Sequence, residues 1–133
     1  MLLDLAERRE EGFVSLKEIA ERQNISKQYL EHIVTLLNTS DILRANRGKL
    51  GGYMLVKEPS EYSVGQILRI TEGSLAPVAC LEDDVNQCSR AENCKTLFLW
   101  TGFHKLINEY FDGMTLQDML DQHNKHSADC YVI

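Results

Sequence analysis

The chain has 133 residues, of which 44% are hydrophobic and 26% charged, and its formal net charge at pH 7 is -6. A chain of this length buries roughly two-thirds of its unfolded surface when it folds, which is enough for one ordinary domain. Its length and composition exclude a disordered protein and a small protein that depends on disulfides. Its longest apolar runs, such as Leu97 to Trp100, are too short for a membrane span or a signal peptide. We therefore expect a cytoplasmic protein without a membrane partner.

Charge is distributed unevenly along the chain. Residues 1–57 have a net charge of +1, whereas residues 58–133 have a net charge of -7. Within the first part, residues 27–57 contain five Lys or Arg against two acidic residues and form the only basic stretch. The acidic total therefore does not exclude a nucleic-acid partner.

The first forty residues predict helices joined by a tight turn. Residues 1–9 have the pattern of the end of a helix. A capping box that begins at Ser15 predicts a short helix ending at Arg22. Ser26 is a second N-cap, and the apolar stripe after it predicts a helix that ends near Asn38.

A hairpin and a further helix follow. Residues 42–45 and 53–56 have the composition of two short strands, and the loop between them contains Arg47, Lys49 and three glycines. A capping box at Ser63 then predicts a helix that stops at Gly73.

The second half of the chain contains a long loop and two helices. Residues 74–93 have no usable period, and such a long polar loop in a small domain indicates a function. Residues 95–111 predict a helix that is apolar around much of its circumference, either a central core helix or half of a dimer interface; the small N-terminal unit favours the dimer. A last helix is expected from Leu116 to about Gln122, and residues 123–133 have no assigned structure.

The helix pair and the hairpin together predict a DNA-binding unit. In a helix-turn-helix the second helix packs on the first with its inner face and offers its outer face to the major groove. The outer face here has only polar residues: Lys27, Gln28, Glu31, His32 and Thr35. A solvated helix face is the alternative for this feature in isolation. The basic, glycine-rich hairpin makes DNA binding the stronger interpretation, because its backbone can approach a phosphate or the minor groove closely.

The predicted fold class is mainly α with a small β-hairpin wing, a winged helix-turn-helix domain plus a long dimerisation helix. We expect a DNA-binding domain over residues 1–73, a cysteine-bearing sensor loop over residues 74–94, and a dimerisation helix with a C-terminal helix and tail over residues 95–133. The expected DNA-contacting residues are Ser26, Lys27, Gln28, Tyr29, Glu31, His32, Arg44, Arg47, Lys49, Gly51, Gly52 and Tyr53.

Three of the four cysteines lie in the long loop, at Cys80, Cys88 and Cys94. Soft thiolate ligands select iron-sulfur clusters, zinc or copper(I), and the absence of a C-x2-C pair argues against an ordinary structural zinc site. Three incidental thiols are the alternative. A fourth ligand would be His104, an acidic residue of the loop, a residue of a partner subunit, or an open position. No nucleophile with its base and no phosphate-binding loop is evident, so the sequence does not predict an enzyme.

The motifs resemble those of the IscR, NsrR and CymR group of winged-helix transcriptional regulators, the Rrf-two superfamily. The resemblance covers nearly the whole chain and depends on four segments: residues 15–20, residues 25–31, the Arg-Gly-x-x-Gly-Gly-Tyr motif of residues 47–53, and the cysteine loop before a long helix containing Leu99 and Trp100. It implies a homodimer that binds a partly palindromic double-stranded DNA operator. The serine, glutamate and wing arginine that read DNA in IscR-like members correspond to Gln28, Glu31 and Arg47, so the serine is replaced here.

The resemblance also implies an iron-sulfur cluster, [2Fe-2S] or [4Fe-4S], held by Cys80, Cys88 and Cys94. Two features depart from the family: the first cysteine interval is longer, and Leu97 stands where IscR has a histidine. The expected function is a dimeric regulator, a repressor, that senses iron-sulfur or redox status. One alternative is a cluster-free CymR-like regulator that signals through a protein partner or thiol oxidation; a less favoured alternative is an iron-sulfur electron carrier.

Overall fold

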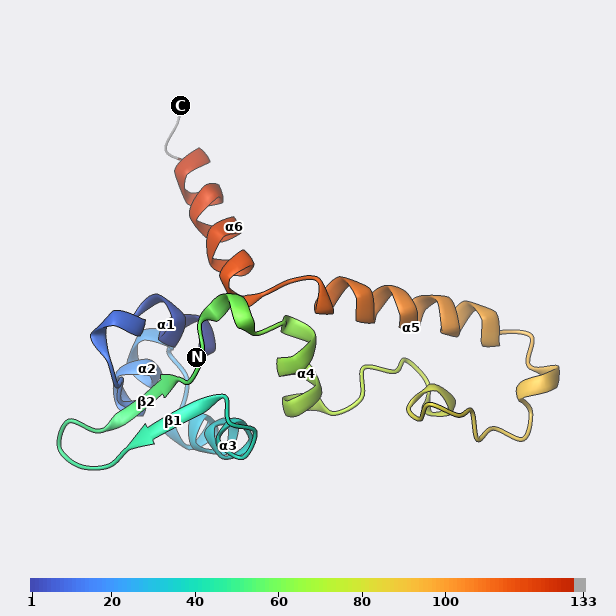
Figure 1. Ribbon diagram of the computed structural model, residues 1–133, viewed down its shortest axis with the longest axis horizontal. Helices are drawn as coiled ribbons and strands as arrows, with labels where there is room; N and C mark the ends of the chain where they lie inside the picture. Colours follow the sequence, from blue (N-terminus) through green and yellow to red (C-terminus); the bar gives the residue numbers. More distant parts are fainter. Residues whose placement is uncertain (131–133) are drawn as a thin grey trace.

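The computed structural model describes residues 1–130 (Figure 1). It contains the helices α1 (Leu2–Glu7), α2 (Leu16–Gln23), α3 (Lys27–Asn38), α4 (Val64–Glu72), α5 (Leu97–Asp112) and α6 (Leu116–Asp129), and the strands β1 (Leu43–Asn46) and β2 (Gly52–Leu55). The two strands pair antiparallel in a single hairpin. The predicted fold class, mainly α with one hairpin, is thus confirmed. None of the helices in residues 1–130 combines the length and the apolar character needed to cross a bilayer.

Side-chain caps start the helices at the predicted serines. The hydroxyl of Ser15 accepts from the backbone N–H of Glu18 at 3.3 Å, and that of Ser26 accepts from Tyr29 at 3.2 Å. Ser63 caps α4 in the same way. Because each cap satisfies an otherwise unpaired N–H group, these positions define where the chain turns into a helix.

The core lies between α1, α2, α3 and the hairpin. Its fully buried side chains are Leu5, Ile19, Leu30, Leu37, Ile42, Leu55 and Tyr62. Leu116 and Leu120, from the first turns of α6, are buried in the same cluster, and α6 packs on α1. The start of the last helix therefore completes the core that supports α3.

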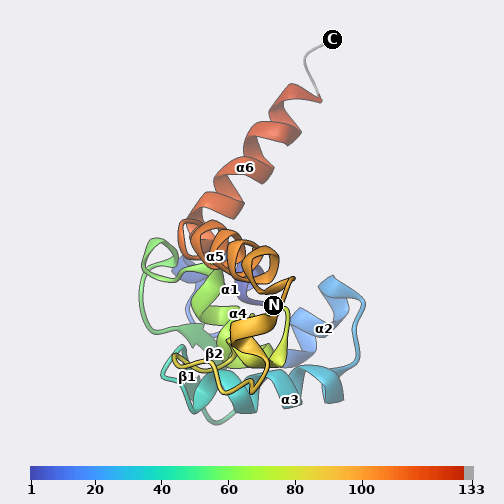
Figure 2. The same cartoon turned by 90° about the vertical axis from the view of Figure 1, so that its right-hand side faces the viewer.

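The long loop and α5 extend away from this core. In Figure 1 the chain leaves the core after α4, passes outward through the loop that contains Cys80, Cys88 and Cys94, and returns along α5. Within this single chain, α5 has no buried residue. Figure 2 shows α6 rising on the side of the molecule opposite α3.

The last helix is longer than predicted. It reaches Asp129 rather than Gln122, because its second half is polar on every side and has no apolar period to reveal it. Once the first turns are fixed by the core, each further residue adds a hydrogen bond at little cost. The strands differ from the prediction by one residue. Of the tail, residues 131–133 lie outside the described part of the chain.

Candidate nucleic-acid interface

Helix α3 divides into a buried face and an exposed face. Leu30, Val34 and Leu37 are buried, and α3 contacts α2. The predicted outer residues, Lys27, Gln28, Glu31, His32 and Thr35, are all exposed. Lys27 and Glu31 form an ion pair of 3.5 Å one turn apart. The exposed face thus presents both hydrogen-bond donors and hydrogen-bond acceptors, on a helix whose other face is fixed in the core.

The turn before α3 is short and well defined. Asn24 ends α2 in the left-handed conformation, with φ of 52°, and the N–H of Ile25 donates to the carbonyl oxygen of Ala20 at 3.1 Å. The hydroxyl of Ser26 is occupied in capping the helix. Tyr29 is 58% exposed at the first turn of α3. The start of α3, which a helix-turn-helix presents to base edges, is therefore held in one place.

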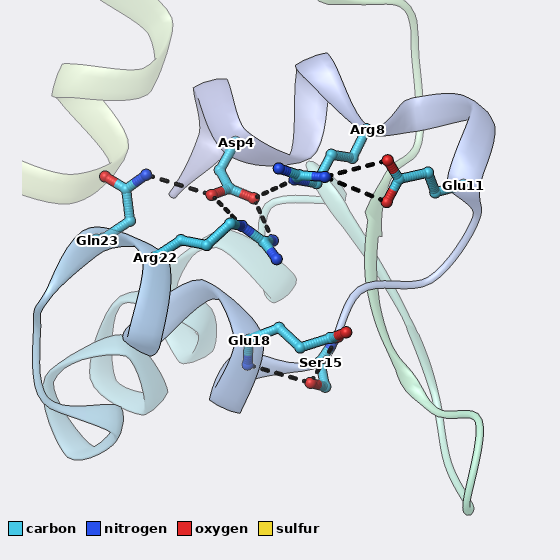
Figure 3. A network of polar contacts seen from close by, with 7 residues as sticks. All are labelled: Asp4, Arg8, Glu11, Ser15, Glu18, Arg22 and Gln23. Atoms are coloured by element: carbon cyan, nitrogen blue, oxygen red, sulfur yellow. Dashed lines mark hydrogen bonds and ion pairs between the residues drawn. The ribbon is translucent and has the colours of Figure 1, made fainter.

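A buried carboxylate joins α1 to the end of α2 (Figure 3). The side chain of Asp4 accepts hydrogen bonds from Arg22 at 2.6 and 3.0 Å and from Gln23 at 3.2 Å. Arg8 lies 3.6 Å from the same carboxylate. Because Gln23 is the last residue of α2, this network fixes the helix end from which the turn to α3 begins.

The network also sets the protonation of Asp4. Asp4 is only 5% exposed, and burial alone would favour its neutral form. The hydrogen bonds from Arg22 outweigh burial and lower the pKa of Asp4 below its ordinary value. Asp4 is thus charged and paired at neutral pH. Sequence patterns missed this pair, since the two residues are 18 positions apart.

The hairpin loop is a narrow turn that requires glycine. The N–H of Gly51 donates to the carbonyl oxygen of Gly48 at 3.0 Å, and a Cβ at Gly51 would collide with the carbonyl oxygen of Asn46. Arg44, Arg47 and Lys49 are exposed along the strand and the turn. The predicted basic wing is therefore present as a closed turn that exposes cationic side chains.

The base of the hairpin is fixed to the N-terminal segment. Tyr53 and Val14 exchange two backbone hydrogen bonds, of 2.8 and 3.0 Å. A Cβ at Gly52 would collide with the carbonyl group of Val14, so only glycine permits this approach. Tyr53 is half-buried against the core, at the foot of the wing. Arg9 adds hydrogen bonds to the carbonyl oxygens of Leu55 and Lys57. No local pattern marked Val14 or Arg9.

The exposed face of α3 and the hairpin lie at the same end of the molecule. Helix α3 contacts β1, and both views place them at the end opposite α6 (Figures 1 and 2). The structure therefore brings together the two parts of the predicted DNA-binding site. Four of the five basic residues of segment 27–57, namely Lys27, Arg44, Arg47 and Lys49, lie on α3 and the hairpin, although the whole chain is acidic.

The loop cysteines are free thiols, and each is at least partly exposed. Cys80 is half-buried, and Cys88 and Cys94 are exposed. Within residues 1–130, no three His, Cys, Asp or Glu side chains are placed so that they could hold a metal ion. The hydroxyl of Thr96 lies 3.6 Å from the Cys94 sulfur, and its hydrogen bond lowers the pKa of that thiol. His104 contacts Asn108 on the same helix.

Helix α5 presents an apolar strip to solvent. Its exposed large side chains are Phe98, Leu99, Phe103, Leu106 and Tyr110. Leu99, Phe103, Leu106 and Tyr110 follow helical spacing and fall on one side of the helix, and Phe98 lies beside this strip in the first turn. The opposite side contacts α4. A continuous apolar strip of this kind marks an interaction surface in a protein of ordinary composition.

The fold is that of the winged helix-turn-helix class of DNA-binding proteins. This class has a short pair of helices, the second with an exposed polar face, and here a basic hairpin follows them. The profile of the Rrf2 family, described as "Iron-dependent Transcriptional regulator", matches residues 1–122. The chain belongs to the Rrf2 family. It is a transcriptional regulator of the IscR and CymR type and not an enzyme.

Individual relatives agree with this assignment. The HTH-type transcriptional regulator CymR of Bacillus subtilis is 35% identical over 119 residues, which cover 90% of this chain and 80% of CymR. The structure of T. potens IscR superposes with a TM-score of 0.72 at 38% identity, over 92% of this chain and 79% of that one. The structure of CymR, described as the global cysteine regulator of B. subtilis, superposes with a TM-score of 0.73 at 32% identity. The superposition covers 91% of this chain and 88% of the CymR chain.

Proposed function

We propose that two copies of this chain bind one double-stranded operator, each with α3 in the major groove and the hairpin in the adjacent minor groove. The observation that supports this most is the position of the exposed face of α3 beside the basic hairpin. Operator occupancy by such a dimer represses transcription where it blocks the polymerase.

The side chains on α3 have distinct roles in this proposal. Gln28 pairs with adenine, Glu31 accepts from the amino group of cytosine, and Lys27 contacts a phosphate or guanine. Lys27 and Glu31 pair with each other in the free protein, and contacts with DNA would replace this exposed, weak ion pair. Tyr29 and His32 border the same contact, and Ser26 acts through the helix cap.

The wing contributes mainly charge. Arg47 and Lys49 reach phosphates or the minor groove, where a narrow groove concentrates negative potential. Arg44 on β1 adds a cation between the wing and α3. Gly51 and Gly52 permit the tight turn, and Tyr53 anchors it. The wing thus supplies affinity and orientation, while α3 supplies most of the base reading.

The apolar strip of α5 is proposed to pair with the same strip of a second copy. One chain alone leaves Phe98, Leu106 and Tyr110 largely exposed, which is costly for a helix with few charges on that side. A self-complementary strip suits a twofold dimer. In this proposal residues 1–73 bind DNA, residues 74–94 respond to the regulatory signal, and residues 95–133 form the dimer.

The cysteine loop is proposed to sense iron-sulfur or redox status. Cys80, Cys88 and Cys94 are the donors that soft iron centres prefer, and the family description as iron-dependent supports a [2Fe-2S] or [4Fe-4S] cluster. The described conformation does not fit such a cluster, because the three sulfurs are not gathered at one point. These cysteines would be the protein ligands if a cluster binds.

A cluster-free regulator is the second candidate, and two observations favour it. The three thiols do not gather at one point, and the chain is similar to CymR, described as the global cysteine regulator of B. subtilis. In that case the exposed thiol of Cys94, which contacts Thr96 and has a lowered pKa, is a candidate for oxidation. The signal would then be thiol oxidation or binding of a protein partner.

Iron and sulfide analysis separates the two candidates. The protein is purified without oxygen, reconstituted with iron and sulfide, and compared with Cys88→Ser and with the matched control Cys130→Ser outside the loop. A cluster sensor binds stoichiometric iron and sulfide with a visible chromophore, which Cys88→Ser loses and Cys130→Ser keeps. If the parent protein holds no iron after reconstitution, the cluster proposal is wrong and the cluster-free candidate stands.

A further inference from the structure

The tip of the basic hairpin contains an apolar residue. Leu50 is 89% exposed, which is the highest value among the large hydrophobic side chains of residues 1–130. Single exposed leucines are common on protein surfaces, so exposure alone implies nothing. The place of Leu50 is what distinguishes it: it follows Lys49 at the end of a turn that otherwise contains only Arg47 and glycines.

The turn holds Leu50 in a defined position. The hydrogen bond from the N–H of Gly51 to the carbonyl oxygen of Gly48 closes the backbone around Lys49 and Leu50. The next residue, Gly52, is held against Val14. In Figure 1 the loop between β1 and β2 projects beyond the rest of the domain. Leu50 thus lies at the tip of an anchored turn, at the rim of a hollow that Phe13 also lines, and its side chain stays exposed there.

The charge and the shape of the turn indicate which kind of partner covers the Leu50 side chain. Arg47 and Lys49 draw the turn toward phosphates, which line both sides of the minor groove. Proteins that enter this groove use basic side chains for attraction and often insert an apolar side chain such as leucine between base pairs. A turn narrowed by glycines admits such an approach, and Leu50 is its one large apolar group.

We propose that Leu50 is an apolar wedge that enters the minor groove beside Arg47 and Lys49 and partly unstacks one base step of the operator. This inference depends on the proposed contact between the wing and DNA. The wedge bends the duplex and favours sites with a flexible pyrimidine–purine step at the wing position, because such steps unstack most easily. Leu50 then contributes to specificity without a hydrogen bond to a base.

The test uses the purified protein and an operator recovered by in vitro selection. The operator has a fluorophore at each end, to report bending, and 2-aminopurine at the step that faces the wing, to report unstacking. Leu50→Ala removes the wedge, Leu50→Met restores an apolar side chain of similar volume, and Lys49→Gln removes a neighbouring charge but leaves the wedge. Affinity is measured over a range of salt concentrations, and thermal melting of each variant checks the fold.

For Leu50→Ala we expect roughly tenfold weaker binding, a smaller bend and loss of the 2-aminopurine signal, with an unchanged salt slope, since no phosphate contact is lost. Leu50→Met retains all three properties. Lys49→Gln lowers the salt slope by about one and keeps the 2-aminopurine signal.

Two results would overturn the wedge. One is a Leu50→Ala variant with the affinity, bend and fluorescence of the parent protein; if that variant also fails to repress transcription, Leu50 contacts a protein instead. The other is a parent protein that neither bends nor unstacks the operator. Failure of the wing contact itself is distinguishable, because neither Lys49→Gln nor Arg47→Ala would then change the salt slope.

Discussion

Arg69 holds Asp112 through two parallel hydrogen bonds, of 2.7 and 2.9 Å, and this pair joins α4 to the end of α5. Arg69 also donates to the side chain of Asn108. The pair lies over Gly65, where an added Cβ would collide with the Asp112 carboxylate. Arg69 and Asp112 thus form a direct side-chain link between α4 and α5, the two helices that the cysteine loop connects.

A double-mutant cycle measures this link. For Arg69→Ala and Asp112→Ala we expect a coupling free energy of about 1 kcal/mol, because the geometry is bidentate but both side chains are partly exposed. The ion pair between Lys105 and Glu109, which lies within α5, is the control and is expected to give about 0.4 kcal/mol. Urea denaturation at one fixed protein concentration measures both. Equal coupling in the two cycles would contradict the special role of Arg69.

Asp4→Asn is expected to destabilise the protein by about 3 kcal/mol at pH 7, because it leaves the charge of Arg22 without its buried partner. The matched control is Asp129→Asn, at an exposed position of α6, with no effect beyond about 0.5 kcal/mol. Thermal or urea unfolding measures both. A loss no larger than that of the control would show that the network does not hold α2.

The same variant has a predictable pH dependence. The pKa of Asp4 is lower in the folded protein than its ordinary value, so the unfolded state binds the proton more readily. Its stabilisation is therefore complete above the unfolded pKa, near pH 4, and is lost as the pH falls through the folded pKa. The stability gap between the parent protein and Asp4→Asn should be constant from about pH 6 to 8 and shrink below about pH 4. A gap that widens on acidification would contradict this.

Arg47→Ala tests the wing. If Arg47 contacts a base, the substitution weakens operator binding by about 1 to 3 kcal/mol; if it contacts a phosphate, it lowers the salt slope by about one for every DNA sequence. Lys125→Ala removes an equal charge from exposed α6, at the opposite end of the molecule, and should change neither. Unchanged binding and slope for Arg47→Ala would remove Arg47 from the interface.

Leu106→Glu tests the α5 dimer. A charge in the middle of the apolar strip should shift the protein from dimer to monomer in sedimentation velocity, because burying it unpaired costs several kcal/mol. Thr101→Glu adds the same charge on the side of α5 away from the strip and should leave the dimer intact. Dimers of normal affinity in Leu106→Glu would show that the copies pair elsewhere.

The features that could be predicted from the sequence are those that depend on residues close to one another in the chain. Serine caps, helical apolar spacing and glycine turns act within a few residues, so Ser15, Ser26 and Ser63 marked the helix starts. The exposed face of α3 followed from the same spacing. The roles of individual side chains on that face stay predictions.

The features that it did not predict depend on residues far apart in the chain. Asp4 and Arg22, or Arg69 and Asp112, look in sequence like ordinary solvated charges, because their partners are fixed only by the packing of separate helices. The placement of the three loop cysteines is equally non-local. Spacing showed that Cys80, Cys88 and Cys94 share one loop but did not determine whether their sulfurs meet.

In vitro selection from random double-stranded DNA, with the bound stoichiometry measured on the recovered site, tests the central claim most directly. Binding as a twofold dimer through α3 predicts two related half-sites in inverted orientation, with centres about one helical turn or a multiple of it apart, bound by two copies of the chain. It also predicts that Gln28→Ala and Glu31→Ala each relax the preference at particular bases within both half-sites. A single half-site bound by one copy, or enrichment that neither substitution alters, would contradict it.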